Sequence, residues 1–141
     1  MHEWALASAI ITTVEEYAKK LGAEEVYEVN IVLGELQAIN EEIMRYALDN
    51  LKKGTICEHA KFVFTTEKAK FKCRNCGHEW SLEEMKGKLS EDVKESIHFM
   101  PEVVKAFIKC PKCGSRDFEV LKGRGLYVSS IVVKENDRSK N

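Results

Sequence analysis

The sequence predicts an α/β protein: a small sheet of about three strands covered by two helices, with a four-cysteine zinc-knuckle domain inserted between two strands. Two observations lead to this prediction. Segments with helical and with alternating hydrophobic spacing follow one another along the chain, and 44% of its 141 residues are apolar, which is enough for a core. Between two of the alternating segments lie two Cys-x-x-Cys pairs, which are typical of a metal module.

Two segments are predicted to be helices. Residues 4–21 carry apolar side chains at helical spacing, and Gly22 is a suitable end for this helix. The second helix is predicted to begin after Asn40, because asparagine is a common N-cap residue and two glutamates follow it in the positive first turn. Gly54 ends it. Each helix presents one apolar face, so we expect both to cover one face of the sheet.

Four segments are predicted to be strands because apolar and polar residues alternate in them: residues 25–33, 60–71, 118–121 and 126–133. The first of them ends at the pair Gly34-Glu35, which breaks the alternation. The predicted domain boundaries follow from these segments. They are an α/β domain of residues 1–70 and 117–135, an inserted metal module of residues 71–116, and a polar tail of residues 136–141.

Four cysteines form the two knuckles: Cys73, Cys76, Cys110 and Cys113. A Cys-x-x-Cys turn directs two thiolates at one point, and two such turns make a tetrahedral four-sulfur site with no open position, so the site is expected to be structural. Gly77 and Gly114, which follow the knuckles, permit the positive φ at which the chain turns away from a metal. Zinc is the expected ion. Iron in a rubredoxin-like site is the rival, because those knuckles have the same spacing.

The first residues, Met1, His2 and Glu3, offer a second metal site. The main-chain nitrogen and Nδ1 of His2 close a six-membered ring around a metal, and either the Met1 amine or the Glu3 amide closes an adjacent five-membered ring. Nickel(II) and copper(II) favour such planar nitrogen sites, whereas zinc has no comparable preference. We expect the Glu3 carboxylate to act in metal transfer rather than as a ligand. The alternative is that His2 is an ordinary solvated histidine.

The planar nitrogen set lacks one donor, and His98 is the candidate for that position. It lies between the two knuckles, on a segment long enough to reach out from a metal core. The competing interpretation is a surface or packing histidine. His59 and His78 are weaker candidates, and His78 is expected to pack beside the first knuckle or to donate a hydrogen bond to a cysteine sulfur. Cys57 is interpreted as a small buried hydrophobe.

Composition and charge argue against several classes of function. The 23 acidic and 22 basic residues nearly cancel, so there is no strong positive field for nucleic acid. No apolar stretch reaches the length of a membrane span, and no signal peptide opens the chain, so a cytoplasmic protein without membrane contact is expected. No nucleophile–base pair and no phosphate loop stand out, so the chain is not expected to be an enzyme.

With the Met-His-Glu start, the Gly34-Glu35 turn and the paired knuckles in one chain, the sequence resembles the HypA/HybF family of nickel metallochaperones. That family matures nickel–iron hydrogenases and, in some organisms, urease. The resemblance implies nickel binding at Met1, His2 and Glu3, with zinc on the four knuckle cysteines. The knuckles are further apart here than in many bacterial members.

The partners that this resemblance implies are a nickel-loading GTPase of the hydrogenase accessory set and the hydrogenase large-subunit precursor. The oligomeric state stays open, a homodimer included. Two rival functions remain from the residues alone. One is a zinc-ribbon adaptor protein in transcription or translation, which would bind RNA or DNA in a salt-sensitive way. The other is an electron carrier with an iron site, which visible absorbance would reveal.

Overall fold

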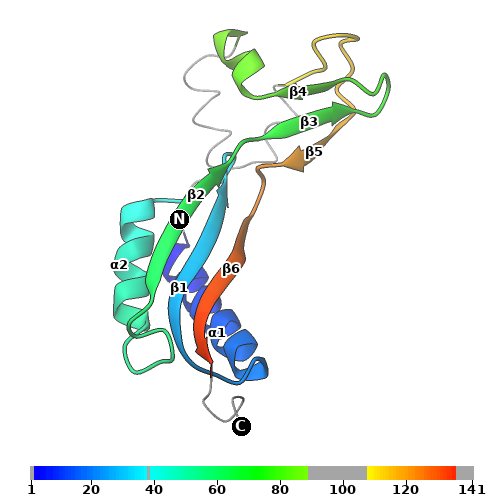
Figure 1. Cartoon of the computed structure of the whole chain (residues 1–141). Coiled ribbons are helices and arrows are strands. Elements are labelled where there is room, and N and C mark those ends of the chain that lie inside the picture. Colours follow the sequence, from blue (N-terminus) through cyan, green and yellow to red (C-terminus); the bar gives the residue numbers. More distant parts are fainter. Residues whose placement is uncertain (1, 38, 89–107, 136–141) are drawn as a thin grey trace. The chain divides into compact units, whose positions relative to one another are not determined.

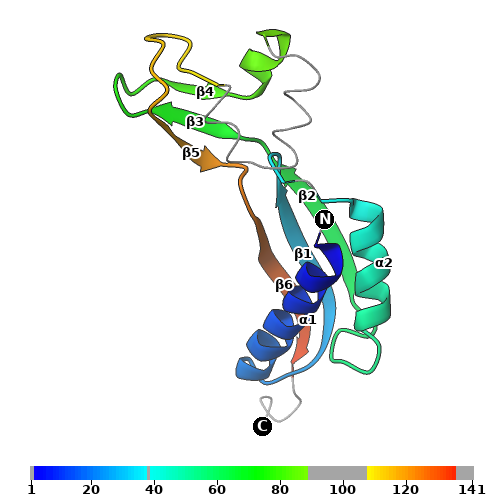
Figure 2. The ribbon, with the colours of Figure 1, turned by 180° about the vertical axis from the view of Figure 1, so that it is seen from behind.

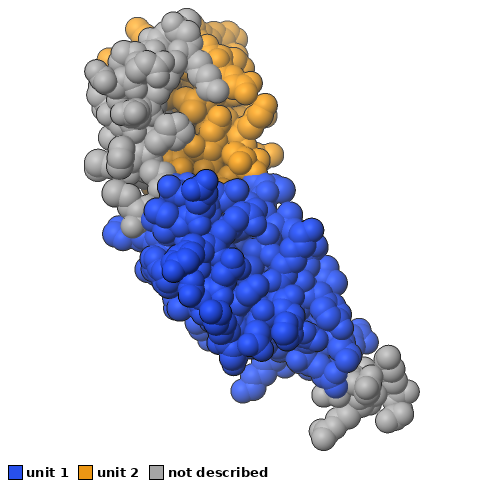
Figure 3. All heavy atoms as spheres, turned by 90° about the vertical axis from the view of Figure 1, so that its left-hand side faces the viewer, with its two compact units in different colours: residues 1–32, 39–65, 127–141 blue, residues 33–38, 66–126 orange. Residues whose placement is uncertain are grey.

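The computed structural model describes residues 2–37, 39–88 and 108–135. The elements follow in the order α1 (Glu3–Lys20), β1 (Ala23–Gly34), α2 (Glu41–Leu51), β2 (Lys61–Glu67), β3 (Lys70–Cys73), β4 (Glu79–Ser81), the 3-10 helix η1 (Glu83–Lys88), β5 (Phe118–Lys122) and β6 (Leu126–Glu135) (Figure 1). The chain divides into two compact units, coloured separately in Figure 3. Unit 1 comprises residues 1–32, 39–65 and 127–141, and unit 2 comprises residues 33–38 and 66–126.

Unit 1 is a three-stranded sheet covered by two helices, as the sequence predicted. The strand order is β2-β1-β6, and α1 and α2 pack together on one face of the sheet (Figures 1 and 2). The core lies between the two layers. Its fully buried side chains come from α1, β1 and α2: Val14, Val26, Val29, Ile31, Met44 and Leu48. A layer of helices over a sheet is the stable way to cover one apolar sheet face.

The two helices form for the local reasons that the sequence indicates. In α1 a stripe of apolar residues at helical spacing is buried, and the chain leaves the helix at Gly22, which has a φ of 69°. In α2 the side chain of Asn40 accepts a hydrogen bond from the Ile43 amide at 3.1 Å, which confirms the predicted cap. Within the described part of the chain, no helix is both long and apolar enough to cross a membrane.

Unit 2 contains a second, separate three-stranded sheet, which the sequence analysis did not predict. Its strand order is β4-β3-β5, and both pairings are antiparallel. Phe71 of β3 lies opposite Trp80 of β4, and Phe118 of β5 completes a group of three aromatic rings with centroids 5.5–5.6 Å apart. All three side chains are buried. This aromatic group is the centre of the unit 2 core.

One predicted strand, residues 60–71, is wrong as a single element, because the structure divides it into β2 and β3, which belong to different sheets. The division falls at Ala69, whose amide donates to the Glu35 carboxylate at 2.7 Å instead of to a neighbouring strand. A side chain added to Gly123 would lie 2.5 Å from the Cα atom of Ala69. Small residues at both positions therefore allow this close backbone approach, which alternation alone does not reveal.

Candidate metal centres

The cysteine knuckles are built on the small sheet of unit 2. Cys73 is the last residue of β3, and in each knuckle the amide of the following glycine donates to the carbonyl of the first cysteine at 2.9 Å. Gly77 and Gly114 both have a φ of 78°, which confirms the conformation predicted for them. Cys73 and Cys110 are buried, whereas Cys76 and Cys113 are exposed. Each knuckle therefore presents one buried and one exposed sulfur to the same point.

The four sulfur atoms lie within 4.8 Å of one another, which confirms the predicted four-cysteine cluster. The Sγ atoms of Cys73 and Cys113 are 3.6 Å apart, and so are those of Cys76 and Cys110. A tetrahedral zinc ion with Zn–S distances of about 2.3 Å requires sulfur atoms about 3.8 Å apart. The cluster thus fits a four-coordinate ion, and it is the only such group among the residues that the structure describes.

Amide groups of the knuckles donate hydrogen bonds to the sulfur atoms. The Cys76 amide lies 3.4 Å from Cys73 Sγ, and the amides of Lys112 and Cys113 lie 3.4 and 3.5 Å from Cys110 Sγ. These donors stabilise negative charge on sulfur, as the surroundings of metal-bound thiolates commonly do. Against the opposing effect of burial, the amides of Cys113 and Lys112 lower the pKa of the Cys110 thiol, which favours the deprotonated form that a metal requires.

The side chain of Asn75 supports Cys113 from the opposite knuckle. Its Nδ2 atom lies 3.6 Å from Cys113 Sγ. Hydrogen bonding to the Ser115 amide, with Asn75 as the next contribution, lowers the pKa of the Cys113 thiol to about 6. An exposed cysteine that is ionised at neutral pH is suited to metal binding. The four sulfur atoms together would fill a tetrahedral coordination sphere and leave no open position for a substrate.

The second candidate site lies at the start of α1. His2 is the N-cap residue and is exposed, and its carbonyl accepts the Leu6 amide at 2.9 Å. Glu3 is the first residue of the helix, and its side chain is only 6% exposed. One carboxylate oxygen of Glu3 accepts the main-chain amide of Asn40 at 3.3 Å. Glu3 thus connects the start of α1 to the residue that caps α2.

Hydrogen bonding lowers the pKa of the Glu3 carboxyl. The amino terminus contributes most, burial opposes it, and the amides of Glu3 and Asn40 lower the pKa further. Glu3 therefore stays ionised while buried. The contact with Asn40 was missed by the sequence analysis, which recognised Asn40 only as a cap. No sequence pattern indicates it, because 37 positions separate the two residues.

Two residues of the predicted nickel set, Met1 and His98, lie outside the described residues. The structure places His2 and Glu3 together because they are neighbours in sequence. Of the weaker candidates, His59 is exposed and lies 3.9 Å from Glu58. His78 stacks on Trp80, with ring centroids 6.1 Å apart, and so packs beside the first knuckle as expected.

Cys57 is fully buried, which confirms its interpretation as a small hydrophobe. Burial, followed by the negative charge of Glu15, raises the pKa of its thiol to about 11. Cys57 belongs to unit 1, whereas the four knuckle cysteines belong to unit 2. Its raised pKa and its place in the other unit therefore separate Cys57 from the four-cysteine cluster.

Comparison with known proteins gives consistent matches along nearly the whole chain. The family model described as "Hydrogenase/urease nickel incorporation, metallochaperone, hypA" matches residues 1–133. A protein from Pyrococcus furiosus named "Hydrogenase maturation factor HypA" is 58% identical over 135 residues, which are 96% of this chain and 97% of that protein. A protein of the same name from Thermococcus sibiricus is 55% identical over 97% of this chain and 99% of that protein.

Among solved structures, the chain is similar to the "Solution structure of the Ni metallochaperone HypA from Helicobacter pylori". The TM-score is 0.66 at 22% sequence identity, and the match covers 96% of this chain and 100% of that chain. At this identity the likeness concerns the fold alone. It agrees with the architecture described above: two helices on a three-stranded sheet, and a separate small sheet that carries the four-cysteine cluster.

Proposed function

The chain belongs to the HypA family of hydrogenase/urease nickel-incorporation metallochaperones, and from this premise we propose a separate role for each of its two candidate metal sites. The protein is a nickel metallochaperone in hydrogenase maturation, a factor without enzymatic activity. We propose that Ni(II) is its cargo, bound at the N-terminus, and that the four-cysteine cluster holds a structural zinc ion. The observation that carries this assignment is the match from residue 1 onward, which includes the Met-His-Glu start.

Zinc at the cluster is supported by the geometry of its donors. Four sulfur atoms at near-tetrahedral separation close the coordination sphere, and the two buried cysteines belong to the apolar core of unit 2. An ion held in this way exchanges slowly and orders the chain around it. Cargo, in contrast, has to be released. The cluster is therefore suited to holding a structural ion and poorly suited to delivering nickel.

Nickel at the N-terminus is supported by the exposure of His2 and by the anchoring of the residue beside it. The main-chain nitrogen and Nδ1 of His2, with either the Met1 amine or the Glu3 amide, supply three donors in one plane, which nickel(II) favours. The buried Glu3 carboxylate keeps the helix start in place through Asn40, while the His2 side chain stays accessible. His98 is our candidate for the fourth donor. Protonation of this histidine would remove its donor nitrogen and so would favour release.

The proposed partners follow from the family. They are a nickel-loading GTPase of the hydrogenase accessory set and the hydrogenase large-subunit precursor. We place the exchange in the cytoplasm, because free thiolates persist as metal ligands in a reducing compartment. Both proposed partners are proteins, so the exchange needs no nucleic-acid or membrane surface on this chain. The net charge of −1 is consistent with this.

The test is nickel titration of the tag-free protein with an intact N-terminus. We expect His2→Ala to abolish the tight site, and we expect His59→Ala, the matched change at another exposed histidine, to leave affinity and stoichiometry unchanged. One residue added before Met1 separates the two nitrogen sets, because the extension removes the Met1 amine but leaves the His2 and Glu3 amides available. Unchanged nickel binding in His2→Ala would contradict the proposed site.

A separate titration tests His98. His98→Ala is compared with the wild type by nickel affinity and by visible absorption of the nickel complex, alone and with the GTPase. A change in spectrum with the His2 site still occupied is the expected result. Identical spectra and affinities under both conditions would exclude His98 as a ligand and leave the His2 site standing.

A further inference from the structure

The four-cysteine cluster is unevenly exposed to solvent. Cys76 and Cys113 are exposed, whereas Cys73 and Cys110 are buried in the core of unit 2. The closest sulfur contacts cross from one knuckle to the other. Sγ of Cys113 lies 3.6 Å from Sγ of Cys73, and Sγ of Cys76 lies 3.6 Å from Sγ of Cys110. Each contact therefore joins an exposed cysteine to a buried one.

We propose that these two contacts make the cluster a redox switch, in which a peroxide converts the four thiolates into two disulfides, Cys73–Cys113 and Cys76–Cys110. This inference rests on the proposed structural zinc ion and gives that site a second state. Sulfur atoms that have entered disulfides no longer bind the ion, because a metal requires thiolates. The occupancy of the cluster thus depends on the level of oxidant, and the connection between the knuckles is kept.

The chemistry of each pair is balanced with hydrogen peroxide as the oxidant. The thiolate of the exposed cysteine attacks one peroxide oxygen and becomes a sulfenic acid, and hydroxide leaves. The thiolate of the buried partner then attacks the sulfur of this sulfenic acid, the S–S bond forms, and a second hydroxide leaves. Each pair gives up two electrons, and each peroxide takes up two. Two peroxide molecules therefore oxidise the whole cluster.

The pairing determines what happens to the fold of unit 2. The two cross-knuckle bonds close loops of 40 and 34 positions, whereas bonds within the knuckles close loops of only three. A disulfide acts mainly by restricting the unfolded chain, and a longer loop gains more. Bonds within the knuckles also leave the end of β3 unconnected to the knuckle that precedes β5. Cross-knuckle pairing therefore keeps the small sheet folded after the ion has left.

The side chain of Asn75 controls how readily Cys113 reacts. Its Nδ2 atom lies 3.6 Å from Cys113 Sγ, and both residues are exposed. A hydrogen bond to a thiolate stabilises the negative charge and lowers the nucleophilicity of the sulfur. Loss of this amide should speed the first step without removing a ligand. Cys57 is fully buried in unit 1 and takes no part in the exchange.

The experiment is titration of the tag-free, zinc-loaded protein with hydrogen peroxide. A zinc-sensitive dye follows release of the ion, and mass spectrometry of unreduced digests maps the disulfides. We expect two peroxide molecules per chain to release the ion and to yield both cross-knuckle disulfides. A dithiol reductant should then restore zinc binding, because sulfenic acids and disulfides are reversible products.

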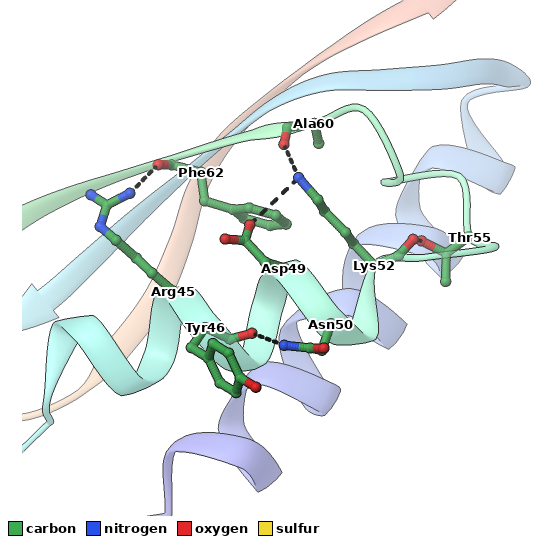
Figure 4. A network of polar contacts seen from close by, with 8 residues as sticks. All are labelled: Arg45, Tyr46, Asp49, Asn50, Lys52, Thr55, Ala60 and Phe62. Carbon is green, nitrogen blue, oxygen red and sulfur yellow. Dashed lines mark hydrogen bonds and ion pairs between the residues drawn. The ribbon is translucent and has the colours of Figure 1, made fainter.

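Two asparagine variants test the rate. Asn75→Ala should release zinc roughly threefold faster than the wild type, since nucleophilicity depends only moderately on thiolate stabilisation. Asn50→Ala is the matched control in unit 1, where the Asn50 side chain donates to the Tyr46 carbonyl at 2.8 Å (Figure 4), and should leave the rate unchanged. Cys57→Ala should also behave as the wild type. Zinc content before oxidation shows whether each variant is folded, and a wild-type rate in Asn75→Ala overturns the role given to its amide.

Hydrogen exchange distinguishes the two ways of pairing. Amides of β3 and β5 should stay protected in the oxidised, zinc-free protein and should lose protection when a chelator strips zinc from the reduced protein. Disulfides within the knuckles, loss of protection in β3 on oxidation, or four reduced cysteines after exposure to excess peroxide overturn the proposal. Protein that carries no zinc before oxidation contradicts the zinc assignment instead, and its disulfide map still decides the pairing.

Discussion

The two units are both three-stranded sheets, but different forces hold them. In unit 1 two amphipathic helices cover the sheet, and buried aliphatic side chains fill the space between the layers. In unit 2 the core is centred on the three aromatic rings, and two other buried members of this core, Cys73 and Cys110, belong to the four-cysteine cluster. We expect hydrophobic burial to suffice for unit 1, and we expect unit 2 to depend in addition on an ion bound at its four cysteines.

The strongest way to separate the units is to remove one metal ligand. Cys110→Ala should release the proposed zinc ion and unfold the small sheet at a cost of several kcal/mol, because structural zinc contributes about 10 kcal/mol or more to folding. The helices of unit 1 should persist. Cys57→Ala is the matched control in unit 1 and should retain the metal. The measurements are zinc content and hydrogen exchange in β3, β5 and α1. Native protection of β3 and β5 in metal-free Cys110→Ala would contradict the comparison.

Truncating one core side chain in each unit sharpens the contrast. Met44→Ala should lower the free energy of unfolding of unit 1 by about 2–5 kcal/mol and leave zinc affinity unchanged. Phe71→Ala should instead weaken zinc binding, since the aromatic group and the buried cysteines form one core. Urea unfolding and competition with a zinc chelator measure the two effects. Equal zinc affinity in both variants would show that core and cluster are independent.

Thiol reactivity distinguishes the units without a substitution. At pH 8 the buried Cys57, with its pKa raised to about 11, should react with iodoacetamide at least roughly 100-fold more slowly than a free cysteine. The knuckle cysteines should react once a chelator removes the metal. Mass spectrometry of the labelled protein identifies the sites. Labelling of Cys57 at the rate of the knuckle cysteines, in folded protein, would be inconsistent with an intact unit 1 core.

The raised pKa of Cys57 also predicts that the stability of unit 1 depends on pH. The folded thiol of Cys57 titrates near 11, above the value of about 8.5 for an unfolded cysteine. The unfolded state therefore loses its proton first, and the stability of unit 1 should fall as pH rises through that window. Cys57→Ala should flatten this part of the profile in urea unfolding. An unchanged alkaline slope in Cys57→Ala would assign the effect to other groups.

The smallest expected effect concerns Glu3. Glu3→Gln removes a charged acceptor for the Asn40 amide and should lower the stability of unit 1 by about 1–2 kcal/mol. Zinc content should not change. We expect nickel to be retained and its transfer to a partner to weaken. Complete loss of nickel with the fold intact would show that the carboxylate is itself a ligand.

Features that depend on near neighbours in the chain were predicted from the sequence. Asn40 caps α2, and Gly77 and Gly114 take a positive φ, because side-chain capping and glycine backbone freedom act within a few residues. The four-cysteine cluster followed from spacing, since each knuckle is a local turn. The helices over a three-stranded sheet followed from the periodicity of buried residues.

The sequence by itself thus determined the helices, the knuckles and the four cysteines of the cluster, because local geometry and donor chemistry decide these. Only the tertiary structure decided where the chain passes from one sheet to the other. A Cβ atom on Gly34 would lie 2.4 Å from the backbone of Gly123, and the Ala69 amide binds Glu35 across 34 positions. The contact of Glu3 with Asn40 is of the same kind. Such contacts depend on packing between distant segments, and no period in the sequence records them.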